Sequence, residues 1–188
     1  MRFPFLINVL ILIACNHPAK EDSGNLPAID TTLKHTDEAT SSIKANQIET
    51  GATSPEELLS FSKTLIGIPY KYASTDPTAG FDCSGFITFV FNHFGITVPR
   101  SSIEFTNVKR EINIEDAKPG DIILFTGTDS TIRQVGHMGI ITSAFNGEIQ
   151  FIHSTSGKAN GVTITSLNNY YKGRFVKVIR VFKQNDVD

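Results

Sequence analysis

The sequence predicts an α+β fold, with helices in the first part of the folded domain and an antiparallel sheet in the second. Helix-start and helix-stop signals bracket two segments between residues 54 and 95. Five short apolar runs, separated by turn signals, follow residue 119. Because helices precede strands, we expect the helices to pack on one side of an antiparallel sheet of about five strands.

The first predicted helix begins after Ser54. Ser54-Pro55-Glu56-Glu57 is a capping-box sequence with proline at the first helical position. Apolar residues at helical spacing follow, up to a stop signal at Gly67. We therefore expect an amphipathic helix in this segment.

A second helix is predicted from Asp82 to Phe94, with Gly95 as its stop signal. Its apolar residues occupy nearly every side: Phe86, Ile87, Phe89, Val90, Phe91 and Phe94. A helix that is apolar most of the way round is buried, so we place this one at the centre of the domain. A short third helix is expected at residues 101–104.

The predicted strands follow a turn at Pro119-Gly120-Asp121. Each is a short run rich in β-branched or aromatic residues. They cover residues 122–125, 137–142, 149–153, 162–165 and 175–182. The second and third are joined through Asn146-Gly147, a dipeptide typical of hairpin turns.

Composition excludes several classes of protein. Of the 188 residues, 40% are hydrophobic and 19% charged, which is typical of a globular domain. The net charge of −2 gives no basic surface for a nucleic acid partner. With only Cys15 and Cys83, the chain has neither a disulfide framework nor a four-cysteine zinc site.

The N-terminus has the pattern of a targeting signal. Arg2 precedes an apolar run of about ten residues, which is too short to span a bilayer. Leu12-Ile13-Ala14-Cys15 resembles a bacterial lipobox, in which Cys15 is lipidated after residues 1–14 are removed. The alternative is an ordinary secretory signal with a free cysteine near its end.

The segment that follows has no aromatic residue through residue 50 and is rich in Ser, Thr, Asn and charged residues. Such a stretch buries too little apolar surface to offset its ordering entropy. We therefore divide the chain into a signal peptide (1–14), a lipidated cysteine with a disordered tether (15–50) and a folded domain (51–188).

Cys83 is the candidate nucleophile because it sits at the start of the buried helix. Unpaired backbone N–H groups and the helix dipole favour an anion there, and should lower the pKa of the thiol. If a histidine base adds an imidazolium beside it, alkylation of Cys83 should persist well below neutral pH. The alternative is an inert core cysteine.

A cysteine nucleophile needs a base, and His137 and His153 on neighbouring strands are the candidates. His93 is ten residues after Cys83, so it faces another side of the same helix. A two-residue Asn-Gly turn would place the two strand histidines on opposite faces of the sheet. We expect instead a three-residue loop, Phe145-Asn146-Gly147, with a bulge at Gly147, which puts both histidines on one face.

Five motifs in this order and spacing resemble the NlpC-type cell-wall cysteine peptidases over about residues 55–183. They are Phe81-Asp82-Cys83-Ser84-Gly85-Phe86, Val98-Pro99-Arg100-Ser101, Lys118-Pro119-Gly120-Asp121-Ile122, Gly136-His137-Met138-Gly139-Ile140 and Phe151-Ile152-His153. The resemblance implies a papain-like fold and hydrolysis of amide bonds in peptidoglycan stem peptides. It assigns Cys83 as nucleophile, His137 as general base and acid, and His153 as the orienting residue.

By the same resemblance, Tyr70 matches a tyrosine near the oxyanion and the substrate amine, and Asp82 and Ser84 match positions lining the substrate cleft. The chain departs from the family at Tyr72-Ala73-Ser74, where Gly-Gly often follows an aromatic residue, and in a long polar loop between Thr126 and Gly136.

We therefore expect a monomeric cell-envelope hydrolase that needs no metal or cofactor and has no separate wall-binding module. Its partners would be peptidoglycan stem peptides and, through the lipid on Cys15, a membrane. Two alternatives remain: a catalytically silent lipoprotein that binds peptidoglycan, and a papain-like acyltransferase or amidase acting on another substrate.

Overall fold

The computed structural model describes residues 47–187. The predicted signal peptide, Cys15 and the tether up to residue 46 lie outside the described residues. No helix within 47–187 is long and apolar enough to cross a membrane. Ile48 and Thr50, which the sequence assigned to the tether, are each only 6% exposed, and Ile48 packs in the main core. The folded unit therefore begins earlier than predicted.

The first predicted helix is α2 (Pro55–Thr64), and its capping box is formed. The Ser54 hydroxyl accepts a hydrogen bond from the Glu57 backbone N–H, and the Glu57 carboxylate accepts one from the Ser54 N–H. The helix buries Leu58 and Leu59. It ends slightly before the predicted stop at Gly67, whose φ of 91° is in the left-handed region.

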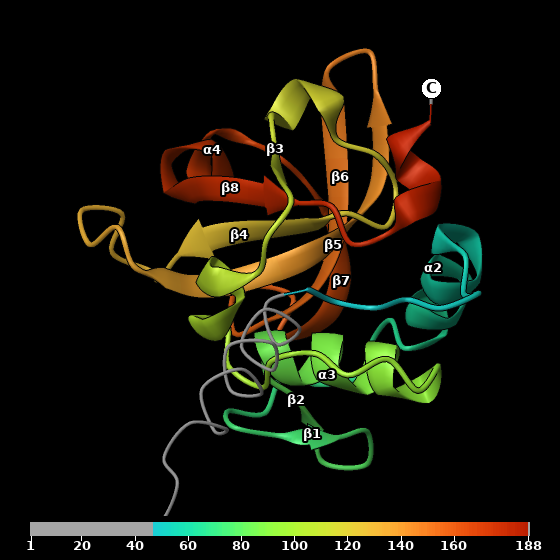
Figure 1. The fold of residues 1–188 in the computed structure, drawn as a ribbon. Helices are drawn as coiled ribbons and strands as arrows, with labels where there is room; N and C mark the ends of the chain where they lie inside the picture. Colours follow the sequence, from blue (N-terminus) through green and yellow to red (C-terminus); the bar gives the residue numbers. More distant parts are fainter. Residues whose placement is uncertain (1–46, 188) are drawn as a thin grey trace, which may run out of the picture. The chain divides into compact units, whose positions relative to one another are not determined.

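The central helix is α3 (Cys83–His93), as the sequence predicts. The Asp82 carboxylate caps it by accepting a 2.6 Å hydrogen bond from the Gly85 backbone N–H. Figure 1 shows α3 beneath the large sheet, with the hairpin of β1 (Thr75–Asp76) and β2 (Gly80–Phe81) beyond it. The predicted third helix is a single 3-10 turn, η1 (Glu104–Asn107).

The α+β fold is confirmed, and the large antiparallel sheet has six strands in the order β3-β8-β4-β5-β6-β7. These are β3 (Glu111–Ile112), β4 (Ile122–Thr126), β5 (Val135–Phe145), β6 (Glu148–Thr155), β7 (Gly161–Ser166) and β8 (Phe175–Ile179). The additional strand, β3, has only two residues, too few to show an alternating pattern. Two further 3-10 turns are η2 (Ile114–Asp116) and η3 (Lys183–Asp186).

A short helix on the other face of the sheet was not predicted. α4 (Asn169–Arg174) begins at Asn168, whose side-chain oxygen accepts hydrogen bonds from the backbone N–H groups of Tyr170 and Tyr171. Tyr171 packs in a second core with residues such as Phe125 and Phe151, separate from the core around α3. The expectation that all helices lie on one side is therefore wrong.

The turn between β5 and β6 also differs from the prediction. Phe145 pairs with Glu148, so the turn contains only Asn146 and Gly147. Both have left-handed backbone conformations, with φ of 52° and 78°, which is the geometry of a two-residue type I′ turn. The predicted three-residue loop with a bulge at Gly147 is wrong.

The extra residue that sets the register lies in β5 instead. The pairing shifts between Ile141 and Ser143, so Thr142 forms a bulge opposite β6. One bulged residue reverses the side-chain alternation, just as one extra loop residue would have done. His137 and His153 consequently lie on the same face of the sheet, and this part of the prediction is confirmed.

Candidate active site

A cavity of about 920 Å³ is lined by both Cys83 and His137. Tyr70 lines it as well, together with residues 155–159, which begin at the last residue of β6, and residues of β7 and α4. The cavity thus joins the start of α3 to the sheet face that α4 covers. Residues far apart in the sequence meet there.

Cys83 is held at the cavity by a close approach of two backbone segments. The Asp82 N–H donates to the Ser74 carbonyl, and a Cβ on Gly85 would lie only 2.0 Å from that same carbonyl oxygen. Only glycine fits at position 85, which allows the first turn of α3 to press against the preceding loop. The Cys83 Sγ then lies 4.0 Å from the carbonyl oxygen of Gly136, the residue before His137.

The two histidines form a direct contact. His137 Nε2 lies 2.8 Å from His153 Nδ1, and the rings are nearly perpendicular at 79°. With Nε2 occupied, the nitrogen of His137 that remains for Cys83 is Nδ1. His153 is fully buried, and its Nε2 lies 2.9 Å from the hydroxyl of Thr165 on β7.

Asp82 and Ser84 do not line this cavity. They are 7% and 6% exposed and form a cluster with Arg100. Arg100 donates to both carboxylate oxygens of Asp82, at 2.7 and 3.3 Å, and to the Ser84 hydroxyl at 3.0 Å. The cluster fixes the first turn of α3, and the predicted contact of Asp82 and Ser84 with substrate stays a prediction.

The electrostatics of Cys83 run opposite to the sequence-based expectation. Burial raises the pKa of its thiol to about 11, and the neighbouring Asp82 carboxylate adds to the increase. Hydrogen bonds from the backbone N–H groups of Ser84 and Cys83 act in the other direction but are outweighed. The sequence-based expectation considered the helix N-terminus and an imidazolium but not the burial of the thiol, which has the largest effect on its pKa.

Both histidines are biased toward their neutral forms. Burial, with smaller contributions from His153 and Arg174, lowers the pKa of His137 well below its usual value. Burial and the Arg174 guanidinium lower the pKa of His153 to about 4. At rest, the site therefore favours a neutral thiol beside a neutral imidazole, and proton transfer from Cys83 to His137 leaves its net charge unchanged.

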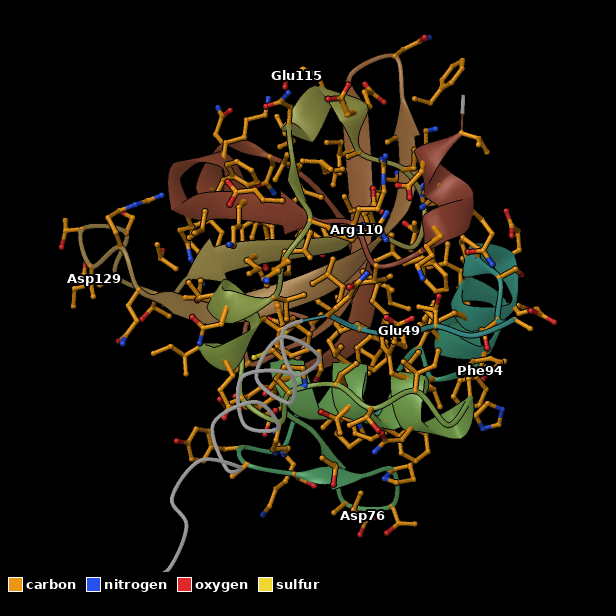
Figure 2. The ribbon with its side chains drawn as sticks, viewed as in Figure 1. Glu49, Asp76, Phe94, Arg110, Glu115 and Asp129 are labelled. Atoms are coloured by element: carbon orange, nitrogen blue, oxygen red, sulfur yellow. The ribbon has the colours of Figure 1, made fainter. Side chains whose placement is uncertain are left out.

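The part of the site that α4 provides was not predicted from the sequence. Arg174 is buried and donates to the carbonyl oxygens of Thr126 and Gly127 and to the Tyr170 hydroxyl. It thereby fixes the start of the long polar loop between β4 and β5. The tip of this loop, at Asp129, projects beyond the sheet (Figure 2). The helix cap at Asn168 was the one sequence signal for this region.

The charged side chains that line the cavity are all positive. Lys158 and Arg174 line it, and none of its described lining residues is acidic. The described part of the chain contains no group of three or more His, Cys, Asp or Glu side chains placed to hold a metal ion. The chemistry that the arrangement offers is that of a thiol beside an oriented imidazole.

Comparison with known proteins agrees with this geometry. The sequence matches the NlpC/P60 family over residues 67–180. It is 33% identical over 135 residues to the gamma-DL-glutamyl hydrolase of Bacillus subtilis (strain 168), covering 72% of this chain and 32% of that protein. It is 40% identical over 123 residues to the probable peptidoglycan endopeptidase LytE of the same strain, covering 64% and 32%. The chain spans about a third of the length of these two curated relatives.

A solved structure shows the same fold. The crystal structure of an NlpC/P60 family protein from Bacillus cereus ATCC 10987 aligns with a TM-score of 0.61 at 28% sequence identity. The alignment covers 71% of this chain and 42% of that one. The helices and antiparallel sheet described above are therefore those of the NlpC/P60 fold.

The raised pKa of Cys83 predicts how its alkylation depends on pH. Because the thiolate is the reactive form, the rate with iodoacetamide should fall about tenfold per unit as pH drops below neutral, with a midpoint above the value of about 8.5 for a free cysteine. Intact-protein mass spectrometry measures the rate, with Cys83→Ala as the blank. A rate that stays level between pH 5 and 7 would instead show a thiolate–imidazolium pair at rest.

Proposed function

Because the chain belongs to the NlpC/P60 family, we propose that it is a cysteine peptidase that hydrolyses amide bonds in the stem peptides or cross-links of peptidoglycan. The observation that carries the proposal is that Cys83 and His137 line one cavity while His153 contacts His137 from behind at 2.8 Å. A nucleophile, a base and a group that orients the base are the parts this chemistry needs.

In the proposed reaction, Cys83 Sγ attacks the scissile carbonyl as its proton passes to His137 Nδ1. The backbone N–H of Cys83, at the N-terminus of α3, helps to hold the negative charge that develops on the carbonyl oxygen. His137 then gives the proton to the leaving amine, and the C–N bond breaks. Water, deprotonated by His137, releases the acyl group from sulfur and regenerates the thiol.

The charge of the cavity fits this substrate. Stem peptides carry free carboxylates on their acidic residues, and the cavity offers Lys158 and Arg174 without an opposing acidic side chain. Tyr70 lines the cavity with Cys83. Burial raises the pKa of its phenol, and the negative charges of Asp82 and of the Cys83 thiolate, when it forms, add to the increase. We assign Tyr70 a substrate contact, with its hydroxyl acting as a hydrogen-bond donor.

We also propose that the protein is attached to a membrane of the cell envelope by a lipid on Cys15, with the segment up to about residue 47 as a tether. The support is in the sequence: a short apolar run after Arg2 leads to Leu12-Ile13-Ala14-Cys15. Acyl chains at about 0.8 kcal/mol per buried CH2 would hold the enzyme close to its polymeric substrate.

The peptidase proposal is tested by digestion of purified muropeptides with the full-length chain in detergent, read by mass spectrometry. We expect new products from the wild type and none from Cys83→Ala or His137→Ala. His93→Gln is the matched control, because His93 stacks on Phe61 at the far end of α3 and should leave the products unchanged. If the wild type forms no products beyond those seen with Cys83→Ala, Cys83 is not a catalytic nucleophile, and the protein would be a peptidoglycan-binding protein rather than a cysteine peptidase.

The lipid anchor is tested by expressing the full-length chain in a bacterial host with labelled palmitate. Wild type and Cys83→Ser should both incorporate the label and begin at Cys15, whereas Cys15→Ser should be unlabelled and retain its leader. An unlabelled wild type cleaved at another residue would show an ordinary secretory signal instead.

A further inference from the structure

A line of polar groups continues from the two buried histidines to the partly buried Thr165. His137, His153 and Thr165 come from the adjacent strands β5, β6 and β7. Thr165 pairs with Phe151, two residues before His153, so it is a diagonal neighbour of His153 on the same face of the sheet. Its Oγ1 lies 2.9 Å from His153 Nε2. The line therefore ends on a hydroxyl group at the wall of the cavity.

The positions of the protons along this line are coupled. Each neutral imidazole carries one proton, and only one proton fits between His137 Nε2 and His153 Nδ1. If His137 is to accept the thiol proton at Nδ1, its own proton must be on Nε2 and must be donated to His153 Nδ1. The proton of His153 is then on Nε2, where it needs an acceptor. Thr165 Oγ1 is the atom placed to accept it.

The opposite arrangement would disable the base. If Thr165 donated its hydroxyl proton to His153 Nε2, His153 would carry its proton on Nδ1 and donate it to His137 Nε2. His137 would then carry its own proton on Nδ1, the nitrogen available to Cys83, and could not take another there. Because Thr165 lines the cavity, its hydroxyl proton can point into the cavity while its oxygen accepts from His153.

We propose that Thr165 is a positioning residue: by accepting a hydrogen bond from His153 Nε2–H, it fixes the tautomers of both histidines so that His137 Nδ1 stays free to act as the base. The effect on catalysis rests on the function proposed above, whereas the tautomers are a property of the folded chain alone. Thr165 would act most strongly once His137 is protonated, because His153 Nδ1 must then be an acceptor.

Three substitutions separate a hydrogen-bonding role from a packing role. Thr165→Val keeps the shape and removes the acceptor, and since His153 is fully buried its Nε2 is left without a partner. We expect kcat on muropeptides to fall by about 10- to 100-fold with KM little changed, by analogy with partners that orient a metal-binding histidine. Thr165→Ser keeps the hydroxyl and should remain within about threefold of wild type. Thr165→Ala leaves space for a water and should be intermediate.

Nitrogen-15 NMR of the histidine side chains in the full-length chain, near pH 8, gives a readout that does not require activity. We expect His153 to carry its proton on Nε2 in the wild type and in Thr165→Ser, and on Nδ1 in Thr165→Val. A His153→Gln spectrum identifies the signals. If Thr165→Val does not fold, Thr165→Ala is compared with Thr165→Ser in the same way.

The experiments can overturn the peptidase function and the role of Thr165 independently of each other. If the wild type does not cleave muropeptides but the tautomer changes in Thr165→Val, the function is wrong and the structural role of Thr165 stands. If the wild type cleaves them while Thr165→Val keeps both its tautomer and its kcat, the role of Thr165 is overturned. Equal losses in Thr165→Ser and Thr165→Val would also overturn it, since they would indicate packing.

Discussion

The contact between His137 and His153 is the interaction on which the rest of the site depends. It requires β5 and β6 to be paired so that both rings leave the same face, and the bulge at Thr142 produces that register. It also requires a residue without a side chain beside the rings. A Cβ on Gly139 would lie 2.7 Å from the Phe151 ring and 2.9 Å from the Ile152 carbonyl oxygen. The histidine pair thus depends on two local features of this hairpin: the bulge at Thr142 and the absence of a side chain at Gly139.

Burial of this pair determines how the site handles charge. Tyr171 from α4 packs against both rings, and Arg174 lies near enough to disfavour a second positive charge on His153. His153 therefore stays neutral, and its Nδ1 can accept the hydrogen bond that His137 Nε2–H donates. Burial and the Asp82 carboxylate raise the pKa of the Cys83 thiol. They therefore also make a thiolate–imidazolium pair of Cys83 and His137 costly in free energy before the sulfur bonds to a substrate carbonyl. Cys83 is therefore expected to lose its proton to His137 as it attacks the substrate, and not before.

Much of the fold could be predicted because its signals are local. The capping box of α2, the cap at Asp82 and the apolar runs that become strands are all local features of the sequence. The remainder depends on tertiary contacts. The bulge at Thr142 arises from pairing with another strand, and α4, at six residues, is too short to show helical periodicity. The direction of the Cys83 pKa depends on how deeply its helix is buried, which spacing along the chain does not reveal.

The proposed reaction requires that the substrate acylates Cys83. The most direct measurement mixes the full-length chain with a purified stem peptide in single turnover, quenches with acid and maps the modified residue by mass spectrometry. We expect the peptide segment on the carbonyl side of the cleaved bond to be found as a thioester on Cys83, and we expect no product from Cys83→Ala. An acyl group on another residue, or product formed by Cys83→Ala, would contradict it.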